Sequence, residues 1–225
     1  MTNKTNVLIV EDEPLIINAL EGALNQLSEN NGLFDFKSKS VTNCDLAKSE
    51  IQKAASSIPI DLILLDISLP ASTDNKLLSG LDVGLLAKEL FPKLKIIVFT
   101  SHNNNYTLNN ILKSLNPEGF LIKSDIDFIK LQEAISSVLN DEPFYSKHIL
   151  QLMRRHLSND FALDKIDRSL LYEISKGTKM KEITNILPLS KSAIEYRKRN
   201  LKQLFDLPNG NDRLLISKAK DCGFI

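Results

Sequence analysis

The first 140 residues alternate between short apolar runs and segments with helical periodicity, and this alternation restricts the possible folds more than any other feature of the chain. The run at 60–65 is apolar at all but one position, which is typical of a strand buried on both faces. Apolar runs lie at 7–10, 60–65, 95–99 and 119–122, with a weaker one near 34–41, and helical patterns follow these runs near 14–29, 44–56, 80–91, 105–115 and 126–139. Five consecutive units of this kind predict an α/β domain with a doubly wound, five-stranded parallel sheet and helices on both faces.

Residues that can carry chemistry follow four of the five apolar runs. In chain order they are Glu11, Asp12, Asp66, Thr100 and Lys123. The carboxyl ends of parallel strands meet at one edge of the sheet, where open α/β folds bind ligands. Taken singly, an acidic residue before a helix is often only a cap, and a lone threonine or lysine at a strand end is usually surface. Their occurrence together at successive strand ends indicates a shared site.

These residue types favour transfer of a phosphoryl group onto a carboxylate. Asp66 is the candidate nucleophile, because an aspartate can form an acyl phosphate. Since a phosphoryl group and a carboxylate repel each other, the site needs a divalent cation and a fixed positive charge. Glu11, Asp12 and Asp66 offer oxygen ligands suited to Mg²⁺, while Lys123 supplies the charge and Thr100 a hydroxyl group. The sequence has no glycine-rich Walker loop, which argues against a nucleotide-hydrolysing enzyme.

With Pro70 four residues after Asp66, and with the segment at 119–123 ending in Lys123, residues 5–140 resemble the receiver domain of two-component response regulators. The resemblance implies a flavodoxin-like fold and a histidine kinase that donates the phosphoryl group to Asp66. It also implies a protein that accepts one phosphoryl group and slowly loses it, and that is not a turnover enzyme.

The same resemblance implies roles for individual residues. Asp12 would bind Mg²⁺ directly, Glu11 would bind it through water, and the carbonyl group of Ser68 would be a further ligand. Thr100 would move toward the phosphoryl group, and Phe120 would rotate into the space that it leaves. Phe120 is equally compatible with a place in the core.

Two features depart from the usual receiver pattern. Family members place a glycine four or five residues after the proline, whereas here residues 71–79 precede Gly80. We expect this inserted loop to lie beside the phosphorylation site, either shaping kinase recognition or, the interpretation that we favour, as a tolerated surface insertion. Ser124 stands where many receivers have a proline after the lysine.

The second part of the chain reads as entirely helical. A break at 141–146 precedes a predicted linker helix at 147–157 and an exposed connection at 158–160. Helical patterns follow near 164–176, 179–187, 190–206 and 211–221, with no strand signal among them. We therefore expect a receiver domain at 1–140, a partly helical linker at 141–160 and a small all-α domain at 161–225.

The two helices near 179–187 and 190–206 are separated by a tight turn. Ser190 is a good cap for the second helix, and Asp164 and Gly177 are good start and stop signals for the first helix of this domain. Core spacing in the second helix falls on Ile194, Leu201, Leu204 and Phe205, and the mostly outward residues are Lys191, Tyr196, Arg197, Lys198, Arg199 and Lys202. A tight turn before a helix with a basic outer face indicates a helix-turn-helix module with a recognition helix for the major groove.

Residues 161–225 resemble the LuxR/NarL-type output domain, through 163–167, Gly177, Leu189, Ser190 and the ending at 219–225. The candidate DNA-contacting residues are Lys179, Lys191, Ser192, Glu195, Tyr196, Arg197, Arg199 and Lys202. Glu195 departs from the family, which commonly has a basic or small polar residue there; a carboxylate repels phosphates but can accept a hydrogen bond from cytosine. Leu214, Leu215 and Ala219 could mediate dimerisation or belong to the core.

Charge is distributed unevenly along the chain. Residues 1–140 carry 12 basic and 17 acidic side chains, and residues 141–225 carry 16 and 11. The basic second part suggests a region that meets a polyanion, although two ordinary surfaces of opposite sign would give the same counts. We predict a phosphorylation-dependent, DNA-binding transcription regulator that dimerises when active. The alternative is a signalling protein whose helical module binds protein or RNA. Because there is no signal peptide and no apolar stretch near 18 residues, we expect a cytoplasmic protein without membrane contact.

Overall fold

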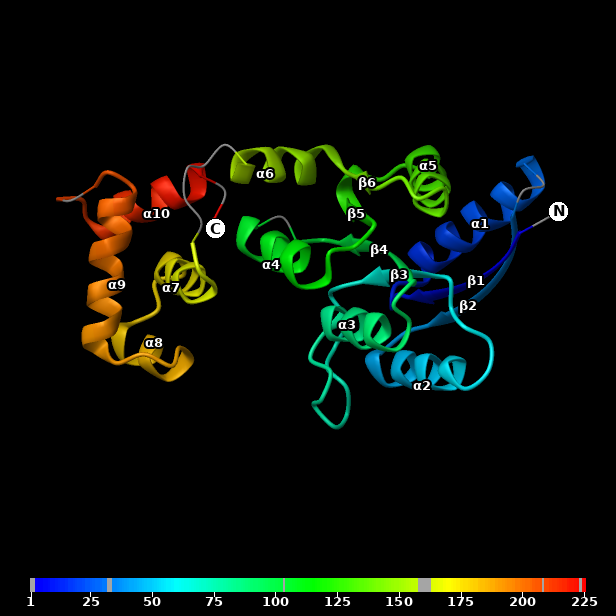
Figure 1. Ribbon diagram of the computed structural model, residues 1–225, viewed down its shortest axis with the longest axis horizontal. Coiled ribbons are helices and arrows are strands. Elements are labelled where there is room, and N and C mark those ends of the chain that lie inside the picture. The colour runs from blue at the N-terminus through cyan, green and yellow to red at the C-terminus, as the bar shows by residue number, and fades with distance from the viewer. Residues whose placement is uncertain (1–2, 32–33, 103, 158–162, 208, 223) are drawn as a thin grey trace. The chain divides into compact units, whose positions relative to one another are not determined.

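The apolar runs of the first part form the strands of one parallel sheet in the computed structural model, which describes residues 3–31, 34–102, 104–157, 163–207, 209–222 and 224–225 (Figure 1). The strands are β1 (Asn3–Val10), β2 (Phe34–Val41), β3 (Leu62–Asp66), β4 (Lys95–Thr100), β5 (Gly119–Ile122) and β6 (Phe144–Tyr145). Their order in the sheet is β2-β1-β3-β4-β5-β6, and every neighbouring pair is parallel. The predicted α/β architecture with a parallel sheet is therefore confirmed.

All five predicted strands are present, and the sheet has a sixth, short edge strand that the sequence did not predict. The missed strand, β6, consists of Phe144 and Tyr145 beside β5. Two residues are too short to show an alternating pattern, and Pro143 before them reads as a break. The pairing comes from the backbone, because Phe144 N donates to Glu118 O at 3.0 Å and Ser146 N donates to Phe120 O at 3.0 Å.

Helices cover both faces of this sheet. They are α1 (Pro14–Asn31), α2 (Cys44–Ala55), α3 (Gly80–Leu90), α4 (Asn105–Leu115) and α5 (Phe128–Leu139), with a short 3₁₀ turn at Lys123–Asp125. Figure 1 shows α1 and α5 on one side of the sheet and α2 and α3 on the other. Alternate residues of a strand face opposite sides, so Val7 and Ile9 pack with Leu24 of α1 and Ile135 of α5. This buried sheet holds its strand ends, and the residues that follow them, in fixed positions.

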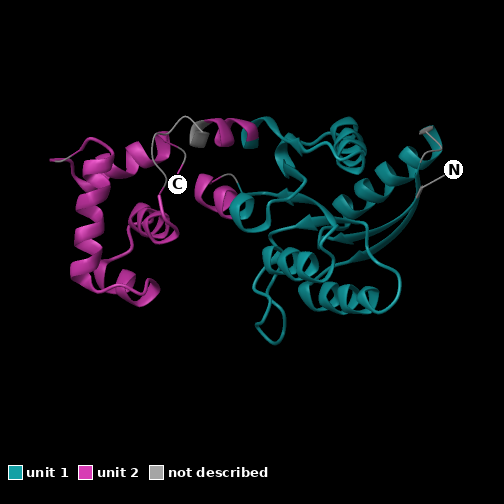
Figure 2. Cartoon of the chain, viewed as in Figure 1, with its two compact units in different colours: residues 1–102, 111–149 teal, residues 103–110, 150–225 magenta. Residues whose placement is uncertain are grey.

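The chain divides into two compact units, which are distinguished by colour in Figure 2. Unit 1 comprises Met1–His102 and Ile111–Ile149, and unit 2 comprises Asn103–Asn110 and Leu150–Ile225, so the division falls within α4. The connection expected at 158–160 lies outside the described residues.

Unit 2 is helical throughout its described residues. After α6 (Lys147–Leu157), whose last part belongs to this unit, come α7 (Lys165–Ser175), α8 (Met180–Ile186), α9 (Lys191–Leu204) and α10 (Asp212–Asp221). The predicted caps are confirmed: Asp164 accepts from Asp167 N and Ser190 accepts from Ala193 N. Gly177 has φ +79°, the left-handed conformation that favours glycine after a helix.

The core of unit 2 corrects part of the predicted core. Ile194, Leu201 and Phe205 are buried as expected, but Leu204 is exposed. Leu204 lies to the side of the row that Ile194, Leu201 and Phe205 form along α9, so it does not face the core. Leu215 and Ala219 are buried in the same core, whereas Leu214 is half exposed. Among the described residues, no helix is both long and apolar enough to cross a membrane.

Candidate functional site

The strand ends of unit 1 bring together the residues that the sequence placed at one edge of the sheet. Glu11 and Asp12 follow β1, Asp66 ends β3, and the three carboxylates offer oxygen atoms that all lie within 4.8 Å of one another. Glu11 and Asp66 are 1% and 2% exposed, while Asp12 is exposed. Parallel pairing explains this arrangement, because Val10 lies opposite Leu65 and the residues after both strands emerge side by side.

Lys123, after β5, is bound to this carboxylate group. Its ammonium nitrogen Nζ lies 3.0 Å from Glu11 Oε1, 2.9 Å from Glu13 Oε1 and 3.1 Å from Asp66 Oδ2. Burial disfavours the charge of the ammonium group, but the hydrogen bonds to Glu13 and Glu11 and the charge of Asp66 raise the pKa of Lys123 above its ordinary value. The surrounding carboxylates therefore favour the charged form of Lys123.

The carboxylates outnumber the cations at this edge of the sheet. Burial raises the pKa of Glu11, and the neighbouring charge of Asp66 raises it further, although the hydrogen bond from Lys123 acts in the opposite direction. Both carboxylate oxygens of Glu11 lie 3.0 Å from Lys123 Nζ, and Oε2 is buried without a further hydrogen-bond partner among the described residues. A group of three neighbouring carboxylates, two of them buried, is an environment that a hard divalent cation fits. The acidic pocket formed by Glu11, Asp12 and Asp66 is consistent with a metal site.

Of the remaining predicted residues of this unit, Ser68 and Thr100 lie at the same edge of the sheet, whereas Phe120 is the second residue of β5. Asp66 Oδ1 accepts a hydrogen bond of 2.9 Å from the backbone amide of Ser68, which helps to hold the carboxylate in place. Thr100 is fully buried, and its Oγ1 accepts from His102 N at 3.1 Å. Phe120 is fully buried in β5. The predicted hydroxyl group and aromatic ring are thus both present, and the ring belongs to the core.

Gly80 lies against the backbone of Asp66. A Cβ atom at this position would stand 1.9 Å from the carbonyl oxygen of Asp66, so only glycine fits, and Gly80 N donates to Ile67 O at 3.2 Å. The inserted residues 71–79 therefore lengthen the loop, yet still return the chain to Asp66 at a glycine.

The inserted loop is folded and is attached to α2. Ser72 is buried, its amide donates to Leu77 O at 2.7 Å, and its hydroxyl group donates to Asp74 Oδ1. Asp74 pairs with Lys48 of α2 at 3.0 Å, and the hydrogen bonds from Ser72 and Lys48 lower the pKa of Asp74. Thr73 N donates to Asp45 at the start of α2. This anchoring was not evident in the sequence, because it joins residues that are about 30 positions apart.

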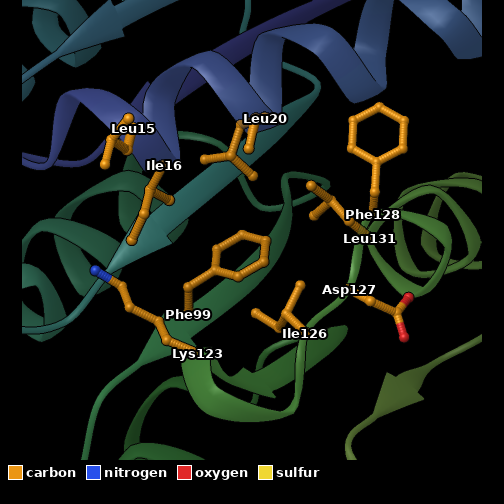
Figure 3. A pocket seen from close by; sticks show the side chains of 10 residues that line it. Leu15, Ile16, Leu20, Phe99, Lys123, Ile126, Asp127, Phe128 and Leu131 are labelled. Carbon is orange, nitrogen blue, oxygen red and sulfur yellow. The ribbon is translucent and has the colours of Figure 1, made fainter.

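A partly apolar pocket that the sequence did not indicate lies between α1 and the start of α5 (Figure 3). It has a volume of about 250 Å³, and Leu15, Leu20, Phe99 and Phe128 line it together with Lys123. Leu15 is 84% exposed although it is a large apolar residue. The apolar periodicity of a helix does not show whether a residue such as Leu15 faces the core or a cavity.

In unit 2, the basic residues of α9 fall into two groups. Arg197 Nη1 donates to Asp164 Oδ2 at 2.8 Å and to Asp167 Oδ1 at 2.7 Å, and these bonds raise the pKa of Arg197. Lys198 and Lys202 both pair with Asp212, at 2.7 Å and 2.9 Å. The expectation that these three side chains lie mostly outward was wrong, because helix spacing does not reveal acidic partners on other helices.

The other predicted DNA-contacting residues of α9 are exposed. They share one face of the helix, since they recur at spacings of three and four residues, and they are Lys191, Ser192, Glu195, Tyr196 and Arg199. Tyr196 is 62% exposed, which is unusual for a large aromatic residue. Lys179 caps α8 through its backbone, as part of a reciprocal arrangement with Glu182.

Comparisons with known proteins agree with this arrangement. Residues 7–136 match the family model of the response regulator receiver domain. The chain is 23% identical over 225 residues to the transcriptional regulatory protein MctR of Rhizobium johnstonii. The alignment covers 99% of this chain and 96% of MctR.

Solved structures share the fold over nearly the whole chain. A structure of two RcsB dimers bound to two parallel DNAs has a TM-score of 0.62 and 21% identity, and covers 97% of this chain and 98% of that chain. RcsB from Salmonella enterica serovar Typhimurium, bound to promoter P1flhDC in the presence of the phosphomimetic BeF₃⁻, has a TM-score of 0.62 and 22% identity, with 96% and 98% coverage. The chain therefore belongs to the response regulator receiver domain family, and its receiver domain is followed by an all-helical unit.

Proposed function

We propose that this chain is a phosphorylation-dependent, DNA-binding transcription regulator of a two-component system, and that it accepts its phosphoryl group from a histidine kinase on Asp66. The observation that carries the proposal is the buried Asp66 carboxylate, bound to Lys123 and flanked by Glu11. Asp66 would attack phosphorus and displace the kinase histidine, while Lys123 would stabilise the charge on the phosphoryl oxygens. The protein is a regulator and not a turnover enzyme.

We propose Mg²⁺ as the cation of this site. Asp12, Asp66 and the carbonyl group of Ser68 would hold it directly and Glu11 through water, and the grouping of the three carboxylates within 4.8 Å of one another supports this ligand set. When bound, the ion would offset the repulsion between Asp66 and the incoming phosphoryl group. Asp12 is the most exposed of the three carboxylates. This exposure suits Mg²⁺, because the bound ion usually keeps several water ligands.

Thr100 and Phe120 are the residues that we propose for the switch. A phosphoryl group adds nearly two negative charges and three strong acceptors, so the Thr100 hydroxyl group gains a partner stronger than the amide of His102. Phe120 neighbours Val98 across the sheet and is fully buried, so any rotation of its ring requires space vacated nearby.

For the output domain, we propose that the exposed face of α9 enters the major groove. The residues that would face the bases and phosphates of the groove are Lys191, Ser192, Glu195, Tyr196 and Arg199. Lys179, at the start of α8, would face the phosphate backbone of the DNA. Arg197 and Lys202, which are paired within the unit, could contact DNA only by giving up their acidic partners. The RcsB dimers bound to DNA support an active homodimer on two half-sites.

We also propose domain boundaries for the chain and a cellular compartment for the protein. We propose a receiver domain at 1–140, a linker at 141–160 and an output domain at 161–225. Because the proposed partners are a kinase that donates phosphoryl groups and duplex DNA, we propose that the protein acts in the cytoplasm.

The experiment that tests this function compares wild type with Asp66→Asn after incubation with Mg²⁺ and acetyl phosphate. We expect the wild-type mass to rise by one phosphoryl group and the protein to shift from monomer to dimer, with neither change in Asp66→Asn. Binding to duplex DNA should then tighten on phosphorylation and weaken steeply with salt. No phosphorylation would contradict the receiver function, and salt-independent binding to RNA or protein alone would favour the alternative function of the output domain.

A further inference from the structure

Every N–H group of the Lys123 ammonium has a carboxylate within reach. An ammonium group has three N–H donors and no acceptor, and three carboxylates lie within 3.1 Å of Nζ. They belong to Glu11, Glu13 and Asp66, which come from two different strand ends. A phosphoryl oxygen that is to bind Lys123 must therefore displace one of these three partners.

The three partners differ in how easily they can be displaced. The side chains of Glu11 and Asp66 are 1% and 2% exposed, so releasing either would leave a buried carboxylate without its cation. The Glu13 side chain is 58% exposed, so water can replace the ammonium group as its partner. Glu13 is the partner that can leave at little cost in free energy.

We propose that Glu13 is a positioning residue that holds Lys123 in the resting site, and that the incoming phosphoryl group displaces the Glu13 carboxylate from Nζ. This inference rests on the proposed phosphorylation of Asp66. Glu13 then opposes phosphorylation in two ways, because it occupies the donor that the phosphoryl oxygen needs and because it adds a negative charge beside an anionic reactant. It thereby sets how much phosphodonor is needed to activate the chain.

The backbone of Glu13 has a separate structural role that a suitable variant preserves. Its carbonyl oxygen accepts from Ile16 N at 3.0 Å and Ile17 N at 3.1 Å at the start of α1, and its amide donates to Glu11 Oε1. Glu13→Gln keeps these bonds and the length of the side chain, and removes only the charge. Glu29→Gln removes the same charge from an exposed position of α1 that is remote in sequence from the site, and is the matched control.

The test measures initial phosphorylation rates of the full-length protein against acetyl phosphate concentration at fixed Mg²⁺. We expect Glu13→Gln to lower the half-saturating concentration of acetyl phosphate by about two- to fivefold, the factor that corresponds to a partly exposed ion pair, with little change in the maximal rate. Glu13→Asp, which keeps the charge, should lie nearer to wild type, and Glu29→Gln should equal it. An unchanged or raised half-saturating concentration in Glu13→Gln would overturn the proposal.

A second measurement is independent of phosphorylation. In Mg²⁺-free protein, the ¹⁵Nζ resonance of Lys123 should shift in Glu13→Gln and stay unchanged in Glu29→Gln; no shift would show that Glu13 does not hold Lys123. If wild type is not phosphorylated but this resonance responds, the proposed function fails and the contact between Glu13 and Lys123 stands. If wild type is phosphorylated and neither measurement responds to Glu13→Gln, only the present proposal fails.

Discussion

Lys123 of the receiver unit and Arg197 of the output unit are both cations held by acidic side chains, yet they are held in different ways. Lys123 is 11% exposed and meets three carboxylates, two of them buried. Arg197 is 27% exposed and meets Asp164 and Asp167, which belong to the start of α7. In the first case negative charge is in excess and buried, so the group attracts further cations. In the second case the pairing fastens α9 to α7 and takes a cation away from the surface that we propose faces DNA.

The largest loss of stability is expected when Lys123 is replaced. Lys123→Met leaves Glu11 and Asp66 buried without a cation, and we expect a loss of about 3 kcal/mol in the stability of the receiver unit in EDTA. Urea unfolding followed by hydrogen exchange in β3 measures it. Lys37→Met, which changes an exposed lysine of β2, is the control and should change stability by less than about 0.5 kcal/mol. A loss below about 1 kcal/mol in Lys123→Met would mean that the site tolerates its unpaired carboxylates.

Mg²⁺ should stabilise one unit and not the other. At a concentration of 100 times its dissociation constant, we expect the receiver unit to gain about 2.7 kcal/mol and the output unit to gain nothing. Hydrogen exchange of the buried amides of β3 and α9, with Mg²⁺ or with EDTA, reports the two units separately. Asp12→Asn should reduce the gain, and an equal gain in both units would show that Mg²⁺ acts nonspecifically.

The paired and unpaired arginines of α9 should have separable effects. We expect Arg197→Met to lower the stability of the output unit by about 1 kcal/mol, because it breaks the bonds to Asp164 and Asp167. Arg199→Met should leave stability within about 0.5 kcal/mol of wild type and weaken DNA binding. Thermal unfolding and fluorescence anisotropy with labelled duplex DNA measure the two effects. Equal effects of both variants on DNA binding would mean that Arg197 also reaches the DNA.

Glu11 and Asp212 should affect the pH dependence of stability with opposite signs. Burial raises the pKa of Glu11 above 4.5, so the folded receiver unit loses stability relative to Glu11→Gln as pH rises from 4.5 to the raised pKa. Burial opposes the charge of Asp212, but hydrogen bonds from Lys198 and Lys202 lower its pKa below 3.8. The stabilising contribution of Asp212 is therefore complete above pH 3.8 and is lost as pH falls through the lowered pKa.

Unfolding of wild type, Glu11→Gln and Asp212→Asn across pH 3 to 7, without Mg²⁺, measures this difference. The free energy of unfolding should change by at most about 1.4 kcal/mol for each pH unit crossed. Slopes of the same sign in both comparisons would contradict the assignment.

Local patterns were sufficient to predict the receiver fold and its candidate site. The strands β1, β3, β4 and β5 each have an apolar run that indicates them, whereas β2 has a weaker one. Right-handed crossovers then bring Glu11, Asp66, Thr100 and Lys123 to one edge. Gly80 was noted only as displaced from its usual spacing, because the 1.9 Å approach of a Cβ atom to the Asp66 carbonyl oxygen exists only once the loop is folded.

The ion pairs on the surface of the output unit could not be predicted from the sequence. Helical spacing correctly placed Ile194 and Leu201 in the core, because burial depends on the repeat of a single helix. The states of Arg197, Lys198 and Lys202 depend on Asp164, Asp167 and Asp212, which lie on or beside other helices.

The sequence by itself determined which elements form and which end of the sheet carries the chemistry, because periodicity and strand ends are local properties of the chain. The tertiary structure alone decided which charges are neutralised, that Glu13 shares Lys123 with Glu11 and Asp66, and that the inserted loop is attached to α2. The physical reason is that ion pairs and desolvation depend on distances between segments remote in sequence, and no local pattern contains those distances.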